Sequence, residues 1–578
     1  MNRRNMSRAI VEAARKAALS AARTNTIGRI GAARTWADAA EHHGGPDDAA
    51  DAFRHLVLML CLEVPTRVDM RTAHLTAGQN VAAEAAYWML CAERPQEAVQ
   101  VLEHVRAILL SRMLRGTDAP RLSELRRRGA AGAAAARDLL KAQQELSAVL
   151  RQDLTRIEAP GAPAAHRSPA DLIRSQREEA HNALWRAEQA ADKLMPSAKH
   201  TLIPFETIRS TAEHGPLIYL ASAKEQGYAV IVTPGEGAQS VQLPQLKTEE
   251  LDEQVLAMSK RASRAGAVQN ALEVLRAGLE PLAAKLAGEL TKGGSRRIIN
   301  LIPVGKISVL PVHAALLDAL PNLQGVRYAA NARMLRHAAE HHRESLRHQP
   351  LSGAYVTDTS CKPLPKLPLG RVLVEDLLSG PNGYCQKPRE RGDDKQPDKS
   401  AGREDLSATL CKAGIVQVCC HGNASERDAL DSYLFAKDDK VTVRDMIVSG
   451  PVRARLIALL ACESHIGDLL LHDEAIGIPG ALTQAGAGAV VAVQWECDTR
   501  AAALLLHEFH SNLRSGLNGP EALAGAQRWL RTATVKTLLG VSDGAYYKKL
   551  RPELGGEDPE SVPYAAPEFW AGWAYTGL

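Results

Sequence analysis

The sequence predicts two kinds of structure in one chain: an all-helical amino-terminal region and an α/β region with a mostly parallel sheet. Residues 1–155 show helical apolar periodicity. From about residue 350, short apolar runs alternate with helical patterns, which is typical of a parallel sheet covered by helices on both faces. With 578 residues the chain is too long for one core, so about two to four domains are expected.

The helical region contains two apolar-periodic helices between Asn80 and Gly116, around the turn "AERP". Small residues alternate there with large ones such as Trp88 and Leu102. The pattern resembles a tetratricopeptide-type helical hairpin, and an ordinary helical bundle is the alternative. Because helical solenoids present a concave binding face, we expect this region to bind a protein partner or the substrate protein.

Residues 156–215 are expected to hold a linker and one helix. The stretch 158–172 is rich in Pro and Ala and reads as the linker, and a helix is predicted over about 170–195.

The segment 216–345 is expected to form the first half of the α/β region. It begins with short β-rich runs separated by Gly-containing turns, and a helix fits 247–290. The stretch "RRIINLIPVGKISVLPVHAAL" then predicts a buried strand, a turn and a helix start.

The segment 346–578 shows the regular alternation. Strands are predicted at 353–358, 414–422, 454–462 and 488–495, and helices at 366–378, 404–412, 473–486 and 499–516. Residues 386–404 have mixed charge, two prolines and no apolar periodicity, which indicates a flexible surface loop.

Composition excludes several classes of function. A net charge of +4 gives no general case for binding nucleic acid or a membrane. The nine cysteines follow no paired spacing, which favours a reducing compartment. The basic start lacks the apolar core of a signal peptide, and Pro479 and Gln484 interrupt the longest weakly polar run, 475–495. We therefore expect a cytoplasmic protein without a membrane span.

Two predicted strands end in residues that carry chemistry. His421 ends one strand, and Cys462 ends the next strand, 41 residues later. Ligands of parallel sheets bind at the carboxyl ends of the strands, so neighbouring strands would bring both side chains to one crevice. A thiolate is a strong nucleophile, and a His beside it can accept and return its proton. Gly422 has no Cβ, so backbone N–H groups there and at Cys462 are candidate donors to an oxyanion.

Five segments in order resemble the CHAT family, bacterial caspase-like proteins related to caspases, separase and gingipains. They are "LIPVGKISVLPVHAALL" (301–317), "DLSATLCKAGIVQVCCHG" (405–422), "LIALLACESHIG" (456–467), the long stretch 473–530, and "AAPEFWAGWAYTGL" (565–578). The resemblance covers about 300–578 well and 216–300 more loosely. It implies a three-layer caspase-like sandwich and a first half, 216–345, that extends the sheet without a dyad of its own.

The resemblance carries the family's catalytic pair to His421 and Cys462, and its oxyanion glycine to Gly422. This chain departs from the family at Ser464 and in the turn "SHIGD", which puts the shape of the pocket beside Cys462 in doubt. The implied activity is that of a cysteine endopeptidase that cleaves a protein, often in bacterial defence or cell death. The alternatives are a catalytically silent scaffold and a hydrolase or acyl-transfer enzyme for small substrates.

Other residues near the predicted crevice have weaker assignments. Asp358 and Asp498, with Trp495, are candidates for a substrate pocket that accepts a basic side chain, but Asp498 also fits a helix N-cap. His507 and His510 share a helical face and are expected to be partly solvated. No His or Cys spacing matches a zinc site, and no nucleotide fingerprint is present. We therefore expect no metal and no cofactor.

Overall fold

The structure is a computed structural model that divides into two compact units, Met1–Phe205 and Glu206–Leu578. Each unit is described by itself. The described residues are 3–24, 26–62, 78, 80–105, 122, 125–155, parts of 176–194, 202–224, 226–259, 264–292, 297–348, 353–357, parts of 406–423 and 432–446, 452–461, 477–540 and 557–578.

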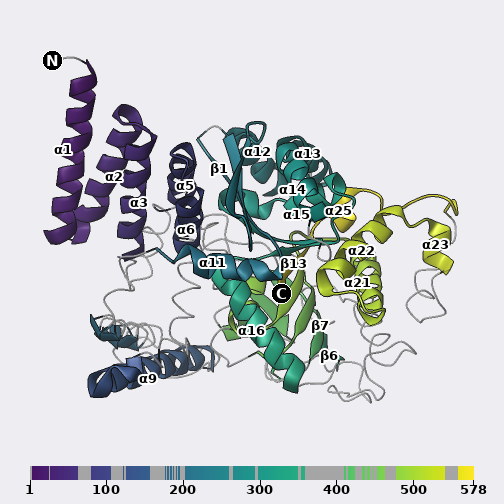
Figure 1. Cartoon of the computed structure of the whole chain (residues 1–578). Coiled ribbons are helices and arrows are strands. Elements are labelled where there is room, and N and C mark those ends of the chain that lie inside the picture. Colours follow the sequence, from purple (N-terminus) through teal and green to yellow (C-terminus); the bar gives the residue numbers. More distant parts are fainter. Residues whose placement is uncertain are drawn as a thin grey trace, which may run out of the picture. The chain divides into compact units, whose positions relative to one another are not determined.

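The amino-terminal unit is helical. Its elements are α1 (Arg3–Thr24), α2 (Thr26–His43), α3 (Pro46–Leu62), α5 (Val81–Cys91), α6 (Pro95–Val105) and α9 (Gly129–Thr155). From α1 to α6, consecutive helices pack on one another (Figure 1). Helices α5 and α6 form the predicted hairpin, with small buried residues such as Ala82 and Ala98 between larger ones. Arg94 in its turn forms ion pairs with Asp47 and Asp51 of α3.

The carboxy-terminal unit is built on one long sheet. Its described strands lie in the order β3-β2-β1-β4-β5-β13-β12-β11-β7-β6. Their bounds are β1 Leu217–Ala223, β2 Gln226–Thr233, β3 Gly237–Leu243, β4 Ile298–Pro303, β5 Gly325–Tyr328, β6 Gly353–Thr357, β7 Ile415–Cys419, β11 Leu456–Leu460, β12 Ala489–Val493 and β13 Trp573–Gly577.

Most pairings in this sheet are parallel. The runs β1-β4-β5-β13 and β12-β11-β7-β6 are parallel throughout. The antiparallel pairs are β1–β2, β2–β3 and β12–β13. Strand β13 pairs in parallel with β5 on one side and in antiparallel with β12 on the other, so it joins the two parallel runs into one sheet. The predicted α/β fold class is confirmed.

Helices cover both faces of the sheet. They are α11 (Phe205–Thr211), α12 (Thr248–Ser259), α13 (Arg264–Gly278), α14 (Glu280–Lys292), α15 (Val312–Ala319), α16 (Ala332–His348), α20 (Ile478–Gln484), α21 (Thr499–Arg514), α22 (Gly519–Thr532), α23 (Val535–Gly540) and α25 (Pro567–Trp570). Short 3₁₀ helices lie at Ala212–His214 and Gly305–Val309.

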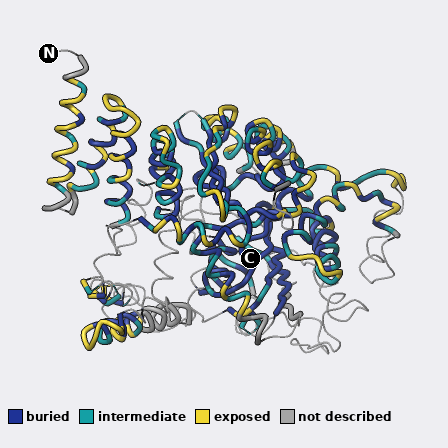
Figure 2. Tube along the Cα trace, viewed as in Figure 1, coloured by how far each residue is buried: buried dark blue, intermediate teal, exposed yellow. Residues whose placement is uncertain are grey.

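The strand β12 shows how the two layers arise. Ala489, Val491 and Val493 join a core that includes α21 and α22. Val490 and Ala492 point to the other face, since side chains alternate along a strand, and α20 and α16 contact β12 and β13. All five residues are buried, which is why the strand sequence reads as a continuous apolar run. Figure 2 shows this burial along the central strands.

A small second sheet follows His421. It consists of β8 (Gly422–Asn423), β9 (Tyr433–Ala436) and β10 (Asp439–Thr442), paired in the order β10-β9-β8. The sequence pattern did not predict it, because two- and four-residue strands are too short to show a period. The predicted strand 414–422 therefore ends at Cys419, and Gly422 belongs to the second sheet.

The single helix expected over 247–290 is wrong, because three helices occupy this stretch. The break between α13 and α14 falls at Gly278, where an added Cβ would lie 2.6 Å from a methyl carbon of Leu246. The absence of a side chain at Gly278 allows close packing on Leu246, two residues before the start of α12. The predicted linker 158–172, helix 366–378 and loop 386–404 lie outside the described residues.

Candidate functional site

The candidate site lies where β7 and β11 end side by side. The two strands pair in parallel register, with Cys419 opposite Leu460. The N–H of Cys420 donates to the carbonyl of Leu460 at 3.2 Å, so the pairing continues one residue beyond β7. His421 follows and is half-buried, and buried Ala461 follows β11. Cys462, the predicted nucleophile, lies outside the described residues.

The second sheet fixes the backbone at His421. The carbonyl of His421 accepts a hydrogen bond from the N–H of Phe435 at 2.8 Å. Gly422, the predicted oxyanion glycine, is paired with Leu434 in antiparallel register. The rings of Tyr433 and Phe435 stack edge to face, 4.9 Å apart. The two sheets therefore meet at the residue predicted to act as the base.

A buried polar pair connects β7, the strand that leads to His421, with helix α21. Gln417 of β7 donates through Nε2 to the carbonyl of Ala458 in β11 at 3.1 Å. Its Oε1 lies 2.9 Å from Nε2 of His510 on α21. Burial, together with the charges of Arg514 and His507, lowers the pKa of His510 to about 3. His510 is therefore neutral near pH 7, and we assign the hydrogen to Nε2, which donates to Gln417.

The expectation that His507 and His510 are partly solvated is wrong. His510 is fully buried and His507 is 8% exposed. Helix α21 packs into the core between the sheet and α22, so both ring-bearing positions face protein. Sequence reasoning missed the Gln417–His510 pair, although a lone Gln in the apolar run "IVQVC" was a signal for a buried hydrogen bond.

Asp498 is the N-cap of α21. Its carboxylate accepts hydrogen bonds from the backbone N–H groups of Arg500 and Ala501, at 2.9 and 3.1 Å, and pairs with the Arg500 guanidinium at 3.0 Å. Burial alone would raise its pKa, but the hydrogen bonds and the charge of Arg500 outweigh burial and lower the pKa. Its role in a substrate pocket stays a prediction. Asp358 lies outside the described residues.

Trp495, the third candidate for the pocket, is 2% exposed. Its Nε1–H donates to the carbonyl of Glu568 at 3.0 Å, and its ring lies against Gly572. These contacts anchor the end of β12 to the segment before β13. They account for the burial of the ring and leave its role toward a substrate as a prediction.

Within the described part of the chain, no cluster of three or more His, Cys, Asp or Glu side chains is suited to hold a metal. The described cysteines form no disulfide. None of the helices in that part is long and apolar enough to cross a membrane.

A mostly parallel sheet between helical layers, with a His following a strand at its carboxyl edge, defines an α/β domain. The sequence profile of the CHAT domain matches residues 194–577. The chain belongs to the CHAT domain family, as the motifs predicted, and the match begins well before residue 300.

Two solved structures resemble the chain distantly. Both are crystal structures of the Saccharomyces cerevisiae separase–securin complex, with TM-scores of 0.38 and 0.36 and 9% identity. The matched regions cover 97% and 100% of this chain, but only 51% and 53% of the two matched chains. The chain thus spans about half the length of those chains. No curated protein sequence matches it.

Proposed function

We propose that the protein is a cytoplasmic cysteine endopeptidase that cleaves a partner protein through His421 and Cys462. In this mechanism Cys462 Sγ attacks the scissile carbonyl carbon after its proton passes to His421. The tetrahedral intermediate collapses, the C–N bond breaks, and the imidazolium protonates the leaving amine. Water, deprotonated by His421, then cleaves the thioester and regenerates the thiol.

One observation carries this proposal: the adjacency and register of β7 and β11. Cys419 pairs with Leu460, and the predicted base and nucleophile each follow their paired residue by two positions in the sequence. Parallel neighbours end at the same sheet edge, which is where ligands of such sheets bind. The register therefore supports a dyad across these two strands.

Two further assignments belong to the proposal. The N–H groups of Gly422 and Cys462 would donate to the oxyanion, and the turn of Gly422 into a second sheet supports a fixed backbone at that position. The helical amino-terminal unit would bind the substrate or a regulator, and its packed helix pairs are consistent with a tetratricopeptide-like binder. Family membership supports a role in bacterial defence or cell death.

The test measures how the rate of alkylation by iodoacetamide depends on pH. Mass spectrometry determines this rate at each cysteine separately. A thiolate paired with an imidazolium reacts well below the ordinary thiol pKa of about 8.5. We expect Cys462 to react at pH 6, and the His421→Ala variant to lose that reactivity. Cys91, which is exposed, supplies a second thiol for comparison within the same sample.

A slow rate at Cys462 that is unchanged in His421→Ala would contradict the dyad. The protein would then be better described as a caspase-like scaffold for protein binding. Loss of reactivity in His421→Ala with an unchanged Cys91 profile supports the dyad and justifies a search for cleaved proteins, with Cys462→Ser as the inactive control.

A further inference from the structure

A cavity lies at the edge of the sheet where β7 and β11 begin, opposite the edge that leads to His421. It has a volume of about 1050 Å³, and its lining includes Ile415 and Leu456, the first residues of β7 and β11, and Ile298 of β4, a strand that runs in the opposite direction. His421 follows the last residue of β7, so the sheet separates the cavity from the candidate catalytic edge. Its size is that of a small-molecule site, and all its lining residues belong to the carboxy-terminal unit.

The lining of this cavity is predominantly basic. Its charged and titratable members are Arg327, Arg343, Arg455, Arg514, His214, His342, Glu213 and Glu521. The arginines come from four elements: β5, α16, the residue before β11, and the last residue of α21. Side chains from rigid, separate elements that meet in one cavity form a preorganised set of donors.

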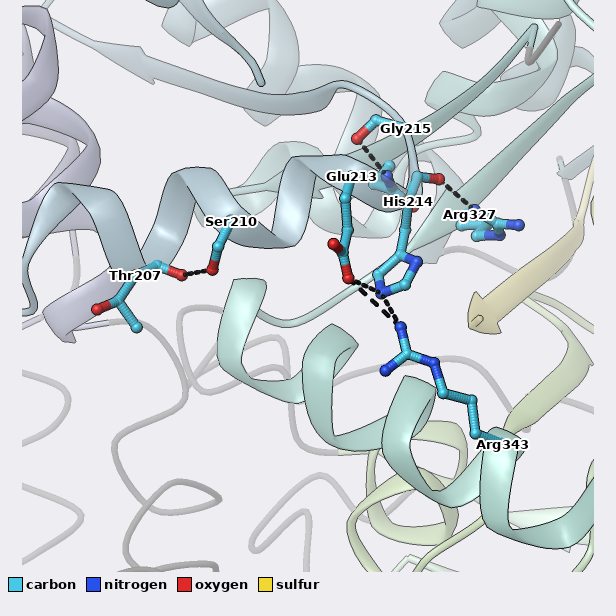
Figure 3. A network of polar contacts seen from close by, with 8 residues as sticks. Thr207, Ser210, Glu213, His214, Gly215, Arg327 and Arg343 are labelled. Carbon is cyan, nitrogen blue, oxygen red and sulfur yellow. Dashed lines mark hydrogen bonds and ion pairs between the residues drawn. The ribbon is translucent and has the colours of Figure 1, made fainter. Parts of the chain in front are cut away.

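The two acidic side chains of the lining are engaged by protein groups, and the carboxyl group of the last residue, Leu578, accepts a hydrogen bond from the Tyr575 hydroxyl at 2.9 Å. Glu213 pairs with Arg343 and His214, each at 3.3 Å (Figure 3). The side chains of Glu213 and Arg343 are 63% and 55% exposed, so this ion pair lies in contact with solvent. Glu521 completes the capping box of α22, where its carboxylate accepts from the N–H of Asn518 at 3.4 Å.

The positive charges of Arg327 and Arg455 affect the pKa values of the same two side chains of the lining, His342 and Tyr575. Burial first, and then the charges of Arg455 and Arg327, lowers the pKa of His342 to about 4. Burial raises the pKa of Tyr575 to about 12, against the opposing effect of the same two arginines. The guanidinium of Arg327 is held by a hydrogen bond to the carbonyl of His214 at 2.8 Å (Figure 3). The two positive charges therefore converge on one place beside buried rings.

We propose that this cavity binds a small molecule that carries a diphosphate or triphosphate group. A guanidinium offers a planar fork of donors that matches phosphate oxygens, and it stays charged at every physiological pH. Several arginines around one cavity match a ligand with several negative charges better than a single carboxylate. This binding is independent of the peptidase proposal, because it involves the opposite edge of the sheet.

The experiment is calorimetric titration of the full chain with inorganic triphosphate, pyrophosphate and orthophosphate, at low and at physiological ionic strength. We expect one triphosphate per chain, bound more tightly than orthophosphate and more weakly as salt is added. Titrations with ATP and adenosine distinguish two sources of the phosphate group. If ATP binds more tightly than inorganic triphosphate, the ligand is a nucleotide. If ATP and triphosphate bind with equal affinity and adenosine does not bind, the cavity recognises the phosphates alone.

The variant Arg455→Gln should weaken triphosphate binding by at least about tenfold, since a charge-assisted hydrogen bond is lost. Arg453→Gln is the matched control, because Arg453 is exposed, lies two residues away and does not line the cavity. It should change the affinity by less than about twofold. Binding that is absent at physiological salt, or weakened equally by both substitutions, would overturn the proposal.

A second measurement on the unmodified protein covers the case in which Arg455→Gln fails to fold. Triphosphate should slow the modification of Arg455 and Arg514 by phenylglyoxal, as mapped by mass spectrometry, and should leave Arg453 unprotected. Equal protection of Arg453, or no protection of Arg455, would contradict a site in this cavity.

Discussion

The imidazole Nε2 of His510 lies 2.9 Å from the side-chain oxygen of Gln417, with both residues buried. Gln417 also bonds the carbonyl of Ala458, its partner in the neighbouring strand. Helix α21 is thereby tied to the two strands that lead to the candidate catalytic edge. In a mostly apolar core, such a pair fixes the position of the helix on the sheet, since each partner is costly to bury alone.

The first prediction concerns the energy of this pair. Replacing His510 with Leu leaves the Gln417 oxygen buried without its donor, which should lower the free energy of unfolding by about 1–3 kcal/mol. Gln417→Leu should cost a similar amount. The double variant should cost less than the two singles together, because it removes both polar groups. Denaturant unfolding of the four proteins measures the coupling.

A matched comparison uses Gln527, another buried glutamine, which bonds the carbonyls of Trp570 and Trp573. These hydrogen-bond partners differ from those of Gln417, so the losses of stability in Gln417→Leu and Gln527→Leu should add within about 0.5 kcal/mol. If the losses in the free energy of unfolding are also additive for Gln417→Leu and His510→Leu, the hydrogen bond between these residues contributes nothing measurable to stability.

The second prediction is a loss of stability on mild acidification. The pKa of His510 is lowered to about 3, and burial lowers those of His337 and His342 to about 4. The unfolded chain binds protons at these residues below pH 6.5 while the folded chain does not. The free energy of unfolding should therefore be fully retained above pH 6.5 and fall below it, by about 1.4 kcal/mol per pH unit for each histidine.

The variant His510→Gln isolates one of these contributions. Its amide can still donate to Gln417 but does not titrate. The loss of stability between pH 6.5 and pH 5 should be smaller than in the unmodified protein by about one histidine's share. Parallel pH profiles for the two proteins would mean that His510 is protonated in the folded state.

The third prediction separates two roles of Asp498. Because Asp498 caps α21, Asp498→Ala should lower the free energy of unfolding by about 1 kcal/mol. Asp498→Asn should lower it much less, since Asn keeps an acceptor oxygen. The substrate-pocket prediction concerns charge. If it holds, Asp498→Asn will reduce cleavage after Arg or Lys while the melting temperature stays near its original value. Unchanged cleavage with normal stability would leave Asp498 with the cap alone.

Several predicted features with local signals agree with the structure. Apolar runs predicted the strands that lead to His421 and Ala461, since burial on both faces leaves a continuous run. The hairpin of α5 and α6 followed from helical periodicity and its turn. Features that depend on distant residues left little signal. The strand β5 has four residues, and its place beside β13 depends on segments far apart in the sequence.

The candidate site shows the same division. The motifs around His421 led to its assignment as the base, because a His-Gly pair after a buried run is a local pattern, and that assignment stays a prediction. The partner of Gln417 was not predictable, since His510 lies 93 residues away in the sequence. The apolar periodicity of its helix also indicated a narrower buried face than the structure has. The basic cavity was likewise hidden, because its arginines come from four separated elements and no short motif joins them.

The last prediction concerns the contact between Trp495 and Gly572. A Cβ added at Gly572 would lie 2.7 Å from the Trp495 ring, which is held by its hydrogen bond to Glu568. Gly572→Ala should therefore lower the free energy of unfolding by about 1–3 kcal/mol through overpacking, whereas Gly235→Ala, with no atom within 4 Å, should have little effect. Adding Trp495→Phe to Gly572→Ala removes ring atoms from the clash, so the double variant should lose less stability than the two singles together. Equal melting temperatures for Gly572→Ala and Gly235→Ala would mean that the ring moves freely, and that the end of β12 is less firmly anchored than these contacts imply.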